Sequence, residues 1–361
     1  MKILVLGAGL VGGPMAVDLA RNDEFDVTVA DISNDSLDKI NLPAIKKVRR
    51  VLSEPSSVRE LALGYDMVLN AVPGFMGFRT LKAIIEAKKN AIDIAFFPED
   101  PFLLDELAKR NDVTAIMDFG VAPGMSNVLI GYTDYLLDET TNVEIYVGGL
   151  PKVRVWPFEY KAVFSPVDVI EEYTRPARYV ENGHLVIREA LSDPELHYFP
   201  GVGTLQSFNS DGLRSLTKTI KCPNMKEKTL RFPGHIDIMA IFRETGFFGK
   251  EEIDMNGTKI RPLDFTAKLL FPKWKMNEGE QDVTVMRVTV EGKKNGKKLR
   301  YNYDLYDEYD RNSGVHSMAR TTGYTATMGI RMLAKSMFTR KGISVPEFVG
   351  KQPECVKFLL E

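Results

Sequence analysis

The first third of the chain alternates short apolar runs with segments of helical periodicity. Several apolar runs show no polar alternation, which is typical of strands buried on both faces. The predicted strands are residues 3–6, 26–30, 67–72, 91–95 and 114–117. Helical segments are predicted after Gly12, from Ser33 or Asn34, over 80–88 and 103–110, and from near Ser126. Strands that alternate with helices in this way predict right-handed crossovers and a parallel sheet.

The pattern changes after about residue 137. Residues 143–147, 283–290 and 299–305 alternate apolar and polar side chains, as in strands that bury one face. The last two are separated by the polar run GKKNGKK, whose Asn295-Gly296 pair predicts a hairpin tip. Helical periodicity returns over 324–335. The expected fold class is an α/β Rossmann-type doubly wound parallel sheet plus an α+β domain with a mainly antiparallel sheet.

Composition and charge exclude several classes of partner. The apolar fraction of 44% and the charged fraction of 27% are ordinary for a globular protein, and 361 residues allow more than one core. A net charge of −2 gives no long-range attraction for nucleic acid or an anionic membrane. The basic clusters at 46–50 and 293–298 are short, and we interpret each as a solvated face or turn. Cys222 and Cys355 provide neither a disulfide framework nor metal-ligand spacing, so we expect no metal.

The apolar N-terminus could be mistaken for a signal sequence. It is interrupted by Gly7 and Gly9 and runs directly into a helical pattern, so we interpret it as the first strand of the fold. No apolar stretch is long enough to span a bilayer. We therefore expect a cytoplasmic protein.

A glycine-rich motif follows the first predicted strand. Gly7-Ala8-Gly9-Leu10-Val11-Gly12 fits GxGxxG, with a buried strand before it and a helix after it. Gly7 permits a tight turn, Gly9 lets the backbone approach a pyrophosphate, and Gly12 allows close packing of helix on strand. The diphosphate would then lie at the helix N-terminus, where free amides and the helix dipole favour negative charge. The motif predicts a dinucleotide site.

Asp31 strengthens this prediction and specifies the cofactor. It ends the second predicted strand about 20 residues beyond the glycines, where a carboxylate accepts hydrogen bonds from ribose hydroxyls and repels a 2′-phosphate. NAD is therefore expected rather than NADP. The alternative role of Asp31 is to cap the following helix. Ala71, Val72 and Pro73 end the next long strand and are expected along the nicotinamide–ribose half of the cofactor.

Further motifs extend along the rest of the chain. They are AVPGFMGF (71–78), FFPEDP (96–101), DFGVAPGMSN (118–127), YVGGLPK (146–152), SPVDVIEEYTRPAR (165–178), SDGLRSL (210–216), TLRFPGH (229–235), RETGFF (243–248) and ARTTGYTA (319–326). In these motifs the chain resembles the saccharopine dehydrogenase-like family, and most closely the L-lysine 6-dehydrogenases within it.

The resemblance implies an organisation and a reaction. Residues 1–122 would form the NAD-binding Rossmann domain, 123–315 a substrate and dimerisation domain, and 316–361 helices that return to the first domain. The implied reaction is NAD-dependent oxidative deamination of the 6-amino group of L-lysine to the 6-semialdehyde, with release of ammonia, in a homodimer. Ala95 stands where relatives often carry a serine, so one hydroxyl that could contact substrate is missing.

An amino-acid substrate requires a cation for its carboxylate and a base for its amine. Arg214 and Arg231 are the candidates for the cation, because the guanidinium fork matches two oxygens; a structural ion pair is the alternative for each. His235 is the candidate base, since an unperturbed pKa near ~6.5 suits proton transfer at neutral pH. It can equally be a histidine beside a helix N-terminus that does no chemistry.

Other residues are predicted at the substrate site with simpler alternatives. Asp93 could bind the substrate ammonium or hold a loop in place. Gly120 belongs to a kinked link that could bring Ser126 and Asn127 to the crevice where ligands bind in open α/β sheets, although Ser126 could simply cap the helix. Further pocket-lining candidates are Tyr160, Lys161 and Phe164.

Two other functions remain open. The first is a saccharopine dehydrogenase or reductase, whose substrate carries additional carboxylates that Arg175 and Arg178 could bind; a carboxy-polyamine dehydrogenase is more distant. The second, from another class, is a non-catalytic NAD-binding sensor. That would be favoured by loss of the base and the arginines, and His235, Arg214 and Arg231 are all present.

Overall fold

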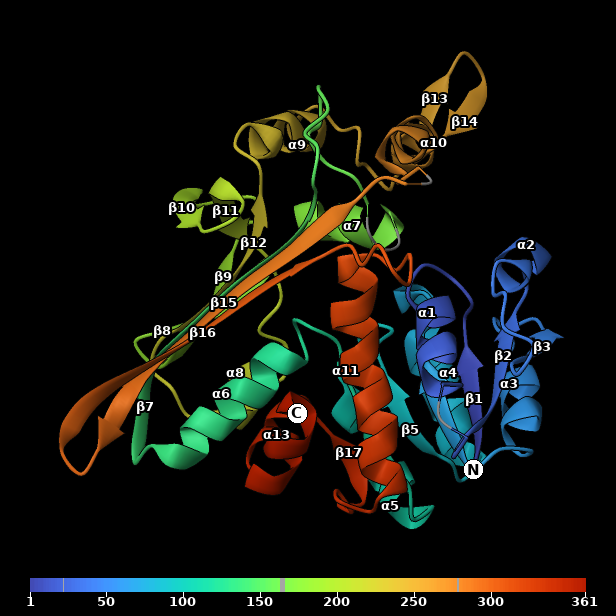
Figure 1. The fold of residues 1–361 in the computed structure, drawn as a ribbon. Helices are drawn as coiled ribbons and strands as arrows, with labels where there is room; N and C mark the ends of the chain where they lie inside the picture. Colours follow the sequence, from blue (N-terminus) through green and yellow to red (C-terminus); the bar gives the residue numbers. More distant parts are fainter. Residues whose placement is uncertain (22, 163–165, 278) are drawn as a thin grey trace. The chain divides into compact units, whose positions relative to one another are not determined.

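The computed structural model describes residues 1–21, 23–162, 166–277 and 279–361 (Figure 1). The chain forms two compact units. One comprises Met1–Leu136 together with Ala319–Glu361, and the other comprises Leu137–Met318. In the described part of the chain, no helix combines the length and apolar character needed to cross a membrane.

The first unit is built on a seven-stranded sheet in the order β17-β6-β5-β4-β1-β2-β3, in which every neighbouring pair is parallel. Its strands are β1 (Lys2–Leu6), β2 (Asp26–Asp31), β3 (Lys46–Arg49), β4 (Met67–Asn70), β5 (Asn90–Asp93), β6 (Thr114–Ile116) and β17 (Gly342–Ser344). Its helices are α1 (Gly12–Leu19), α2 (Asn34–Asp38), α3 (Pro55–Ala62), α4 (Gly74–Glu86), η1 (Pro101–Leu104), α5 (Asp105–Arg110), α6 (Met125–Leu136), α12 (Pro346–Gly350) and α13 (Pro353–Leu360), with α11 (Ser317–Ala334) entering from the end of the second unit. The predicted doubly wound parallel sheet is confirmed.

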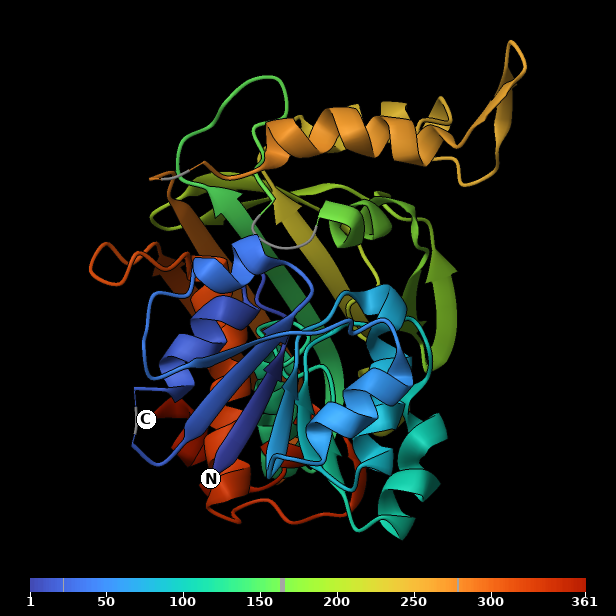
Figure 2. The same cartoon turned by 90° about the vertical axis from the view of Figure 1, so that its right-hand side faces the viewer.

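Both faces of this sheet are buried, which explains the continuous apolar runs. Ile3 and Val5 of β1 pack into one apolar cluster, whereas Leu4 and Leu6 pack into another. Side chains alternate between the two faces along a strand, so a strand covered on both sides is apolar at successive positions. Figure 2 shows helices on both sides of the blue strands.

Two strands of this sheet were not predicted. The basic cluster at 46–50, interpreted as a solvated face or turn, contains β3 at one border of the sheet, and the charged side chains of this strand are exposed to solvent. Strand β17 is only three residues long and joins the opposite border by pairing with β6. The predicted cap at Ser33 is confirmed, because its Oγ accepts a hydrogen bond from the Ser36 N–H at 3.2 Å.

The second unit carries an eight-stranded sheet in the order β10-β11-β12-β7-β15-β16, with β8 beside β12 and β9 beside β8. The strands are β7 (Glu139–Pro151), β8 (Ala177–Glu181), β9 (His184–Arg188), β10 (Glu195–Phe199), β11 (Gly203–Asn209), β12 (Met225–Arg231), β15 (Asp282–Lys294) and β16 (Lys297–Glu308), and a separate hairpin pairs β13 (Ile253–Met255) with β14 (Thr258–Ile260). The helices are α7 (Pro166–Thr174), α8 (Leu216–Thr219), α9 (His235–Glu244) and α10 (Pro262–Trp274). The pairing is antiparallel except between β12 and β7, so the sheet is mixed.

The hairpin predicted at Asn295-Gly296 is confirmed. Both residues have positive φ, 50° and 75°, and they join β15 to β16 with Lys294 opposite Lys297. A two-residue turn with positive φ at both positions matches the twist of the flanking strands. Strand β16 is thereby placed at the border of the sheet (Figure 1).

Candidate functional site

The glycine turn lies between β1 and α1, where two close approaches demand glycine. Gly7 has φ +100°, and a Cβ on it would lie 2.7 Å from the Ala71 carbonyl oxygen at the end of β4. A Cβ on Gly12 would lie 2.0 Å from the Gly7 carbonyl oxygen. The absence of a Cβ at these two positions therefore allows β1, α1 and the end of β4 to approach one another closely. At Gly9, by contrast, a Cβ would meet nothing within 4 Å, so the backbone there faces open space.

Asp31 at the end of β2 holds this turn in place. Its Oδ2 accepts a hydrogen bond from the Ala8 N–H at 2.7 Å, and its Oδ1 accepts one from the Ser33 N–H at 2.8 Å. The side chain is partly exposed, and a carboxylate has further lone pairs to offer a ligand hydroxyl. Ser33 supplies the cap of α2, so Asp31 fixes the backbone just before the helix without capping it, and its ribose role stays a prediction.

These residues lie where a dinucleotide would fit. The strand order reverses at β1 and β4, and in open α/β sheets ligands bind outside the carboxyl ends of strands at such a point. The open backbone at Gly9, the α1 N-terminus and Asp31 are the groups that would hold the pyrophosphate and a ribose. Ala71 is hydrogen-bonded to Leu6 and continues β4 at the same edge, directly before Val72 and Pro73.

Asp93 ends β5 in the interior of the first unit. It is fully buried; its Oδ2 accepts from Asn70 Nδ2 at 2.6 Å and its Oδ1 accepts from the Ala95 N–H at 2.8 Å. These contacts join the ends of β4 and β5, as expected for the loop-holding alternative. Binding of a substrate ammonium by Asp93 would need the buried carboxylate to become accessible.

The link into α6 is kinked as predicted. A cis peptide precedes Pro123, and Gly124 has φ +140°, where a Cβ would lie 1.9 Å from the Gly120 carbonyl oxygen. Helix α6 begins at Met125, so Ser126 lies inside the helix and does not cap it. Ser126 and Asn127 are both fully buried and bonded to each other at 2.9 Å, and their substrate role stays a prediction.

In the second unit, the structure brings three predicted residues into one buried cluster. Arg231 ends β12, and its guanidinium lies 4.5 Å from the centre of the Tyr160 ring. His235 begins α9, with its ring 5.1 Å from that of Tyr160. Each of the three is at most 3% exposed. We define Tyr160, Glu172, Tyr173, Arg231, His235 and Trp274 as the arginine cluster.

The donors of Arg231 already have protein partners. Nη2 donates to Glu172 Oε2 at 2.7 Å, Nη1 to the Leu230 carbonyl at 3.0 Å and Nε to the Tyr173 hydroxyl at 3.4 Å. Burial raises the pKa of Glu172, and the neighbouring guanidinium opposes that rise. The arrangement matches the ion-pair alternative for Arg231, and a substrate carboxylate would have to compete with Glu172.

His235 does not keep in the folded protein the unperturbed pKa that made it the candidate base. Its Nδ1 lies 2.8 Å from the Phe158 carbonyl, which can only accept, so Nδ1 carries the proton and Nε2 accepts from the Tyr173 hydroxyl at 2.9 Å. Burial, and then the charge of Arg231, lower the pKa of His235 to about 3 instead of the ordinary 6.5. At neutral pH the ring is therefore a neutral hydrogen-bonding group and a weak base.

The remaining predicted residues are dispersed. Lys161 donates to the Lys275 carbonyl at 3.2 Å and lies 3.3 Å from Glu280. Arg214 is 7% exposed in a left-handed backbone conformation, φ 53°, which is costly for a residue with a side chain and is often found at functional sites. Phe164 lies outside the described residues.

Three members of the arginine cluster were missed from the sequence. Glu172 and Tyr173 lie on α7, within a motif that carried the family resemblance, and Trp274 ends α10. The Trp274 Nε1–H has no hydrogen-bond partner among the described residues. Their gathering depends on α7 packing against both α9 and α10, which spacing along the chain does not reveal.

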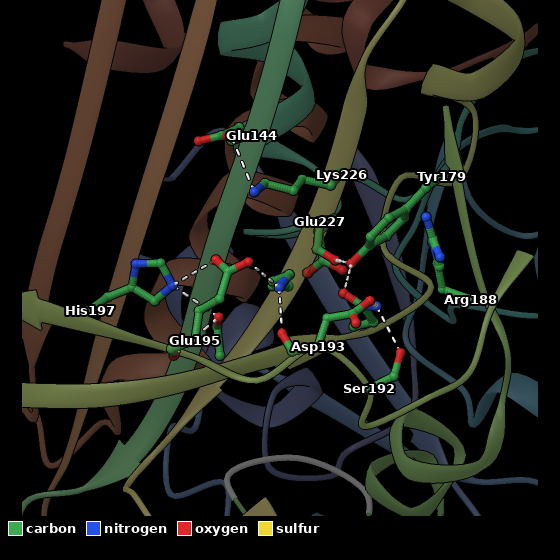
Figure 3. Close-up of polar contacts among 12 residues, drawn as sticks. Glu144, Tyr179, Arg188, Ser192, Asp193, Glu195, His197, Lys226 and Glu227 are labelled. Atoms are coloured by element: carbon green, nitrogen blue, oxygen red, sulfur yellow. Dashed lines mark hydrogen bonds and ion pairs between the residues drawn. The ribbon is translucent and has the colours of Figure 1, made fainter. Parts of the chain in front are cut away.

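A second polar cluster lies on the opposite face of the same sheet, around a pocket of about 480 Å³. Figure 3 shows the polar contacts among its residues. Lys228 is only 2% exposed and donates to Glu195 Oε1 at 2.9 Å, while Lys226 lies 3.2 Å from Glu144. At the rim Arg188 pairs with Glu181 at 2.7 Å. Each of these three cations is neutralised by a carboxylate of the protein, so none of them calls for an anionic ligand.

The strand order, the glycine turn and Asp31 define a Rossmann dinucleotide-binding protein. Residues 3–116 match the family model described as the saccharopine dehydrogenase NADP binding domain, and residues 120–361 match the saccharopine dehydrogenase C-terminal domain. The chain therefore belongs to the saccharopine dehydrogenase family, as the motifs predicted.

Its relatives differ in how much of their length it covers. It is 26% identical over 285 residues to the mitochondrial alpha-aminoadipic semialdehyde synthase of Mus musculus. The matched region covers 74% of this chain and only 31% of that protein. It is 23% identical over 384 residues to the carboxyaminopropylagmatine dehydrogenase of Synechocystis, covering 99% of this chain and 94% of that one. The saccharopine dehydrogenase (L-Glu forming) of Saccharomyces cerevisiae shares the fold, with a TM-score of 0.80 and 17% identity over 99% of this chain and 96% of that chain.

Proposed function

We propose that the protein is an NAD-dependent oxidoreductase that oxidises a C–N bond of an amino-acid substrate. The observation that carries the proposal is the glycine turn, open at Gly9 and bordered by Asp31, in a chain that covers nearly all of a named dehydrogenase of its family. NAD is preferred in this proposal because the carboxylate of Asp31 would repel a 2′-phosphate. Bound there, NAD would supply a hydride acceptor.

The second unit would supply recognition of the substrate. In this proposal Arg231 or Arg214 binds the substrate carboxylate, since both are nearly buried guanidinium groups in a low-dielectric setting. The hydrogen-bonded pair Tyr173–His235 keeps the arginine cluster ordered. Burial raises the pKa of Tyr173 to about 12, so its hydroxyl remains a donor at neutral pH.

The substrate we propose is L-lysine, with oxidation at the 6-amino group and release of ammonia. The resemblance of the sequence motifs to those of L-lysine 6-dehydrogenases supports this choice. A second candidate is an amine that carries an additional carboxylated arm, favoured by the near full-length match to carboxyaminopropylagmatine dehydrogenase. The predicted cations for such an arm are already engaged: Arg178 makes two 2.8 Å bonds to Asp211, and Arg175 lies 3.7 Å from Glu171.

A substrate panel tests this proposal. Purified protein with NAD⁺ or NADP⁺ is given L-lysine, saccharopine, carboxylated polyamines and other amino acids, and reduced nicotinamide is followed by absorbance. We expect turnover with lysine and NAD⁺. Turnover with a carboxylated amine alone would establish the second candidate, and nucleotide binding without turnover of any amine would indicate the sensor.

Matched arginine variants identify the carboxylate clamp. Arg214→Met and Arg231→Met are compared with Lys268→Met, a change on α10 outside the arginine cluster. The clamp variant should raise KM for lysine at least tenfold, since a hydrogen bond to a charged group contributes about 1.5–3 kcal/mol. For a substrate that lacks the carboxylate, the wild type and the clamp variant should have similar KM values.

A further inference from the structure

Glu172 is the one carboxylate in the arginine cluster and the member that a ligand can reach most directly. Its side chain is 23% exposed, whereas the other members of the cluster are buried. It lies on α7, one residue before Tyr173, and contacts the guanidinium at the end of β12. The entrance to this otherwise buried cluster is therefore acidic.

One oxygen of this carboxylate is held, and the other is available. Glu172 Oε2 accepts a hydrogen bond from Arg231 Nη2 at 2.7 Å, whereas Oε1 accepts none from the residues that the structure describes. An ionised carboxylate offers about four acceptor positions. Arg231 thus orients the carboxylate and leaves acceptor positions for a donor on a ligand.

The charges around Glu172 make a cationic donor favourable. Asp168 lies four residues earlier on α7, so the two carboxylates share one face of the helix. Burial and the charge of Asp168 raise the pKa of Glu172, while Arg231 and Arg175 oppose the rise. An ammonium group beside Glu172 would relieve the repulsion between the carboxylates and favour their ionised forms.

Two buried groups of the cluster indicate that its hydrogen bonding is incomplete. The Tyr160 hydroxyl and the Trp274 Nε1–H have no partner among the described residues. The Tyr160 ring lies 4.5 Å from the Arg231 guanidinium, and its centre is 5.5 Å from that of Trp274. Buried polar groups are normally satisfied by the protein, a ligand or an ordered water. These two groups therefore support a ligand site at the arginine cluster.

The proposed substrate has two amino groups, and only one of them suits Glu172. The 6-amino group of L-lysine must be neutral when a hydride leaves the carbon beside it. A carboxylate favours the charged form of an adjacent amine, so Glu172 would oppose oxidation of a group that it held. The 2-ammonium stays charged throughout the reaction, and it lies beside a carboxylate much as Glu172 lies beside Arg231.

We propose that Glu172 accepts a hydrogen bond from the 2-ammonium group of the amino-acid substrate and selects for that group, and that Arg231 is a positioning residue that orients this carboxylate. The inference rests on the proposed function and adds to it an anion for the substrate ammonium. It holds whichever arginine binds the substrate carboxylate, because a guanidinium has five N–H donors and can orient Glu172 while it contacts a second group.

Two substrates that differ only in the 2-amino group isolate this contact. 6-Aminohexanoate is L-lysine without that group; it keeps the carboxylate and the 6-amino group, so effects on the carboxylate clamp cancel in the ratio of the two kcat/KM values. The wild type should prefer L-lysine by roughly tenfold or more, because only L-lysine makes the charged hydrogen bond. In Glu172→Gln the ratio should fall to near one, since the amide oxygen stays with Arg231 and the amide N–H groups face the ammonium.

Two further variants separate recognition from damage to the fold. Glu171→Gln changes the neighbouring carboxylate on α7, which pairs with Lys250 at 2.8 Å, and should keep the preference for L-lysine. Glu172→Gln leaves the buried guanidinium without its carboxylate, so the double variant Glu172→Gln/Arg231→Gln, which buries no unpaired charge, is measured beside it and should show the same loss of preference. The fluorescence of buried Trp274 verifies that each variant is folded.

The outcomes distinguish this inference from the proposed function. If the wild type oxidises L-lysine but treats 6-aminohexanoate equally well, the inference is overturned and the proposed function stands. The same holds if Glu172→Gln and the double variant keep the preference, or if Glu171→Gln loses it to the same extent. A wild type that oxidises no L-lysine refutes the proposed substrate and this inference with it.

Discussion

His235 makes the stability of the second unit sensitive to acid. The ring is 2% exposed beside Arg231, and its pKa is lowered from 6.5 to about 3 by burial and by that charge. The unfolded chain therefore binds a proton at this site at a pH where the folded chain does not. Stability contributed by the neutral ring is complete above pH 6.5 and is lost as the pH falls from there toward 3.

The size of the effect follows from the two pKa values. Over the whole range it amounts to about 5 kcal/mol, at about 1.4 kcal/mol for each tenfold change in proton affinity. Between pH 7 and pH 5 the folded ring stays neutral while the unfolded one becomes mostly charged, which costs about 2 kcal/mol. That corresponds to a roughly 30-fold change in the unfolding equilibrium.

Replacement of His235 by Gln isolates this contribution. Gln keeps an acceptor for the Tyr173 hydroxyl but does not titrate, so the variant should lose about 2 kcal/mol less stability than the wild type between pH 7 and pH 5. Urea unfolding followed by fluorescence reports on this unit, because Trp274 is fully buried in the arginine cluster. The exposed His184 on β9 supplies a matched control. Equal pH profiles for wild type and His235→Gln would refute the reasoning.

Three further predictions concern other parts of the molecule. Gly12→Ala should lower the free energy of unfolding by about 1–3 kcal/mol and weaken dinucleotide binding, because its Cβ would lie 2.0 Å from a carbonyl oxygen. Gly9→Ala, whose Cβ would meet nothing within 4 Å, should keep the melting temperature and weaken only dinucleotide binding. If Gly9→Ala bound NADH as tightly as the wild type in a titration, the placement of the pyrophosphate would be contradicted. Asp31→Ser should weaken NAD binding about tenfold and reduce the ratio of the Kd for NADP to the Kd for NAD, both measured by calorimetric titration. A wild-type preference for NADP would contradict the role given to Asp31. Burial raises the pKa of Glu227 to about 8, so its contribution is present below pH 4.5 and is lost as the pH rises through 8; between pH 6 and pH 9 the wild type should lose roughly 2 to 3 kcal/mol that Glu227→Gln retains in urea unfolding, and parallel profiles would argue against a neutral Glu227.

The sequence predicted those features of the fold that are written in short stretches of chain. The predicted strands of the first sheet are apolar on both faces, and the glycine turn and the Asn295-Gly296 tip each need a backbone conformation that few residues supply. Strand β17 and the parallel contact of β12 with β7 depend on partners far along the chain. The local pattern of apolar and polar residues therefore predicts neither the strand β17 nor this parallel pairing.

The candidate site divides in the same way. Gly7, Gly9, Gly12 and Asp31 could be identified by spacing, because a phosphate-binding turn is a local structure. The environment of His235 could not, since its altered pKa arises from Arg231 and from burial beside α7, a helix that the sequence pattern did not predict. A residue type suggests chemistry, but the groups around it determine the protonation state in which it works.

The position of β17 has a consequence for how the protein is made. The first sheet is complete only when β17 pairs with β6, yet β17 is synthesised more than two hundred residues later, after the whole second unit. At 5–20 residues per second, a ribosome would leave the edge of β6 uncovered for about 10 to 45 s. The second unit, whose chain is continuous, can fold in that interval, while the nucleotide-binding unit waits for the last segment to emerge.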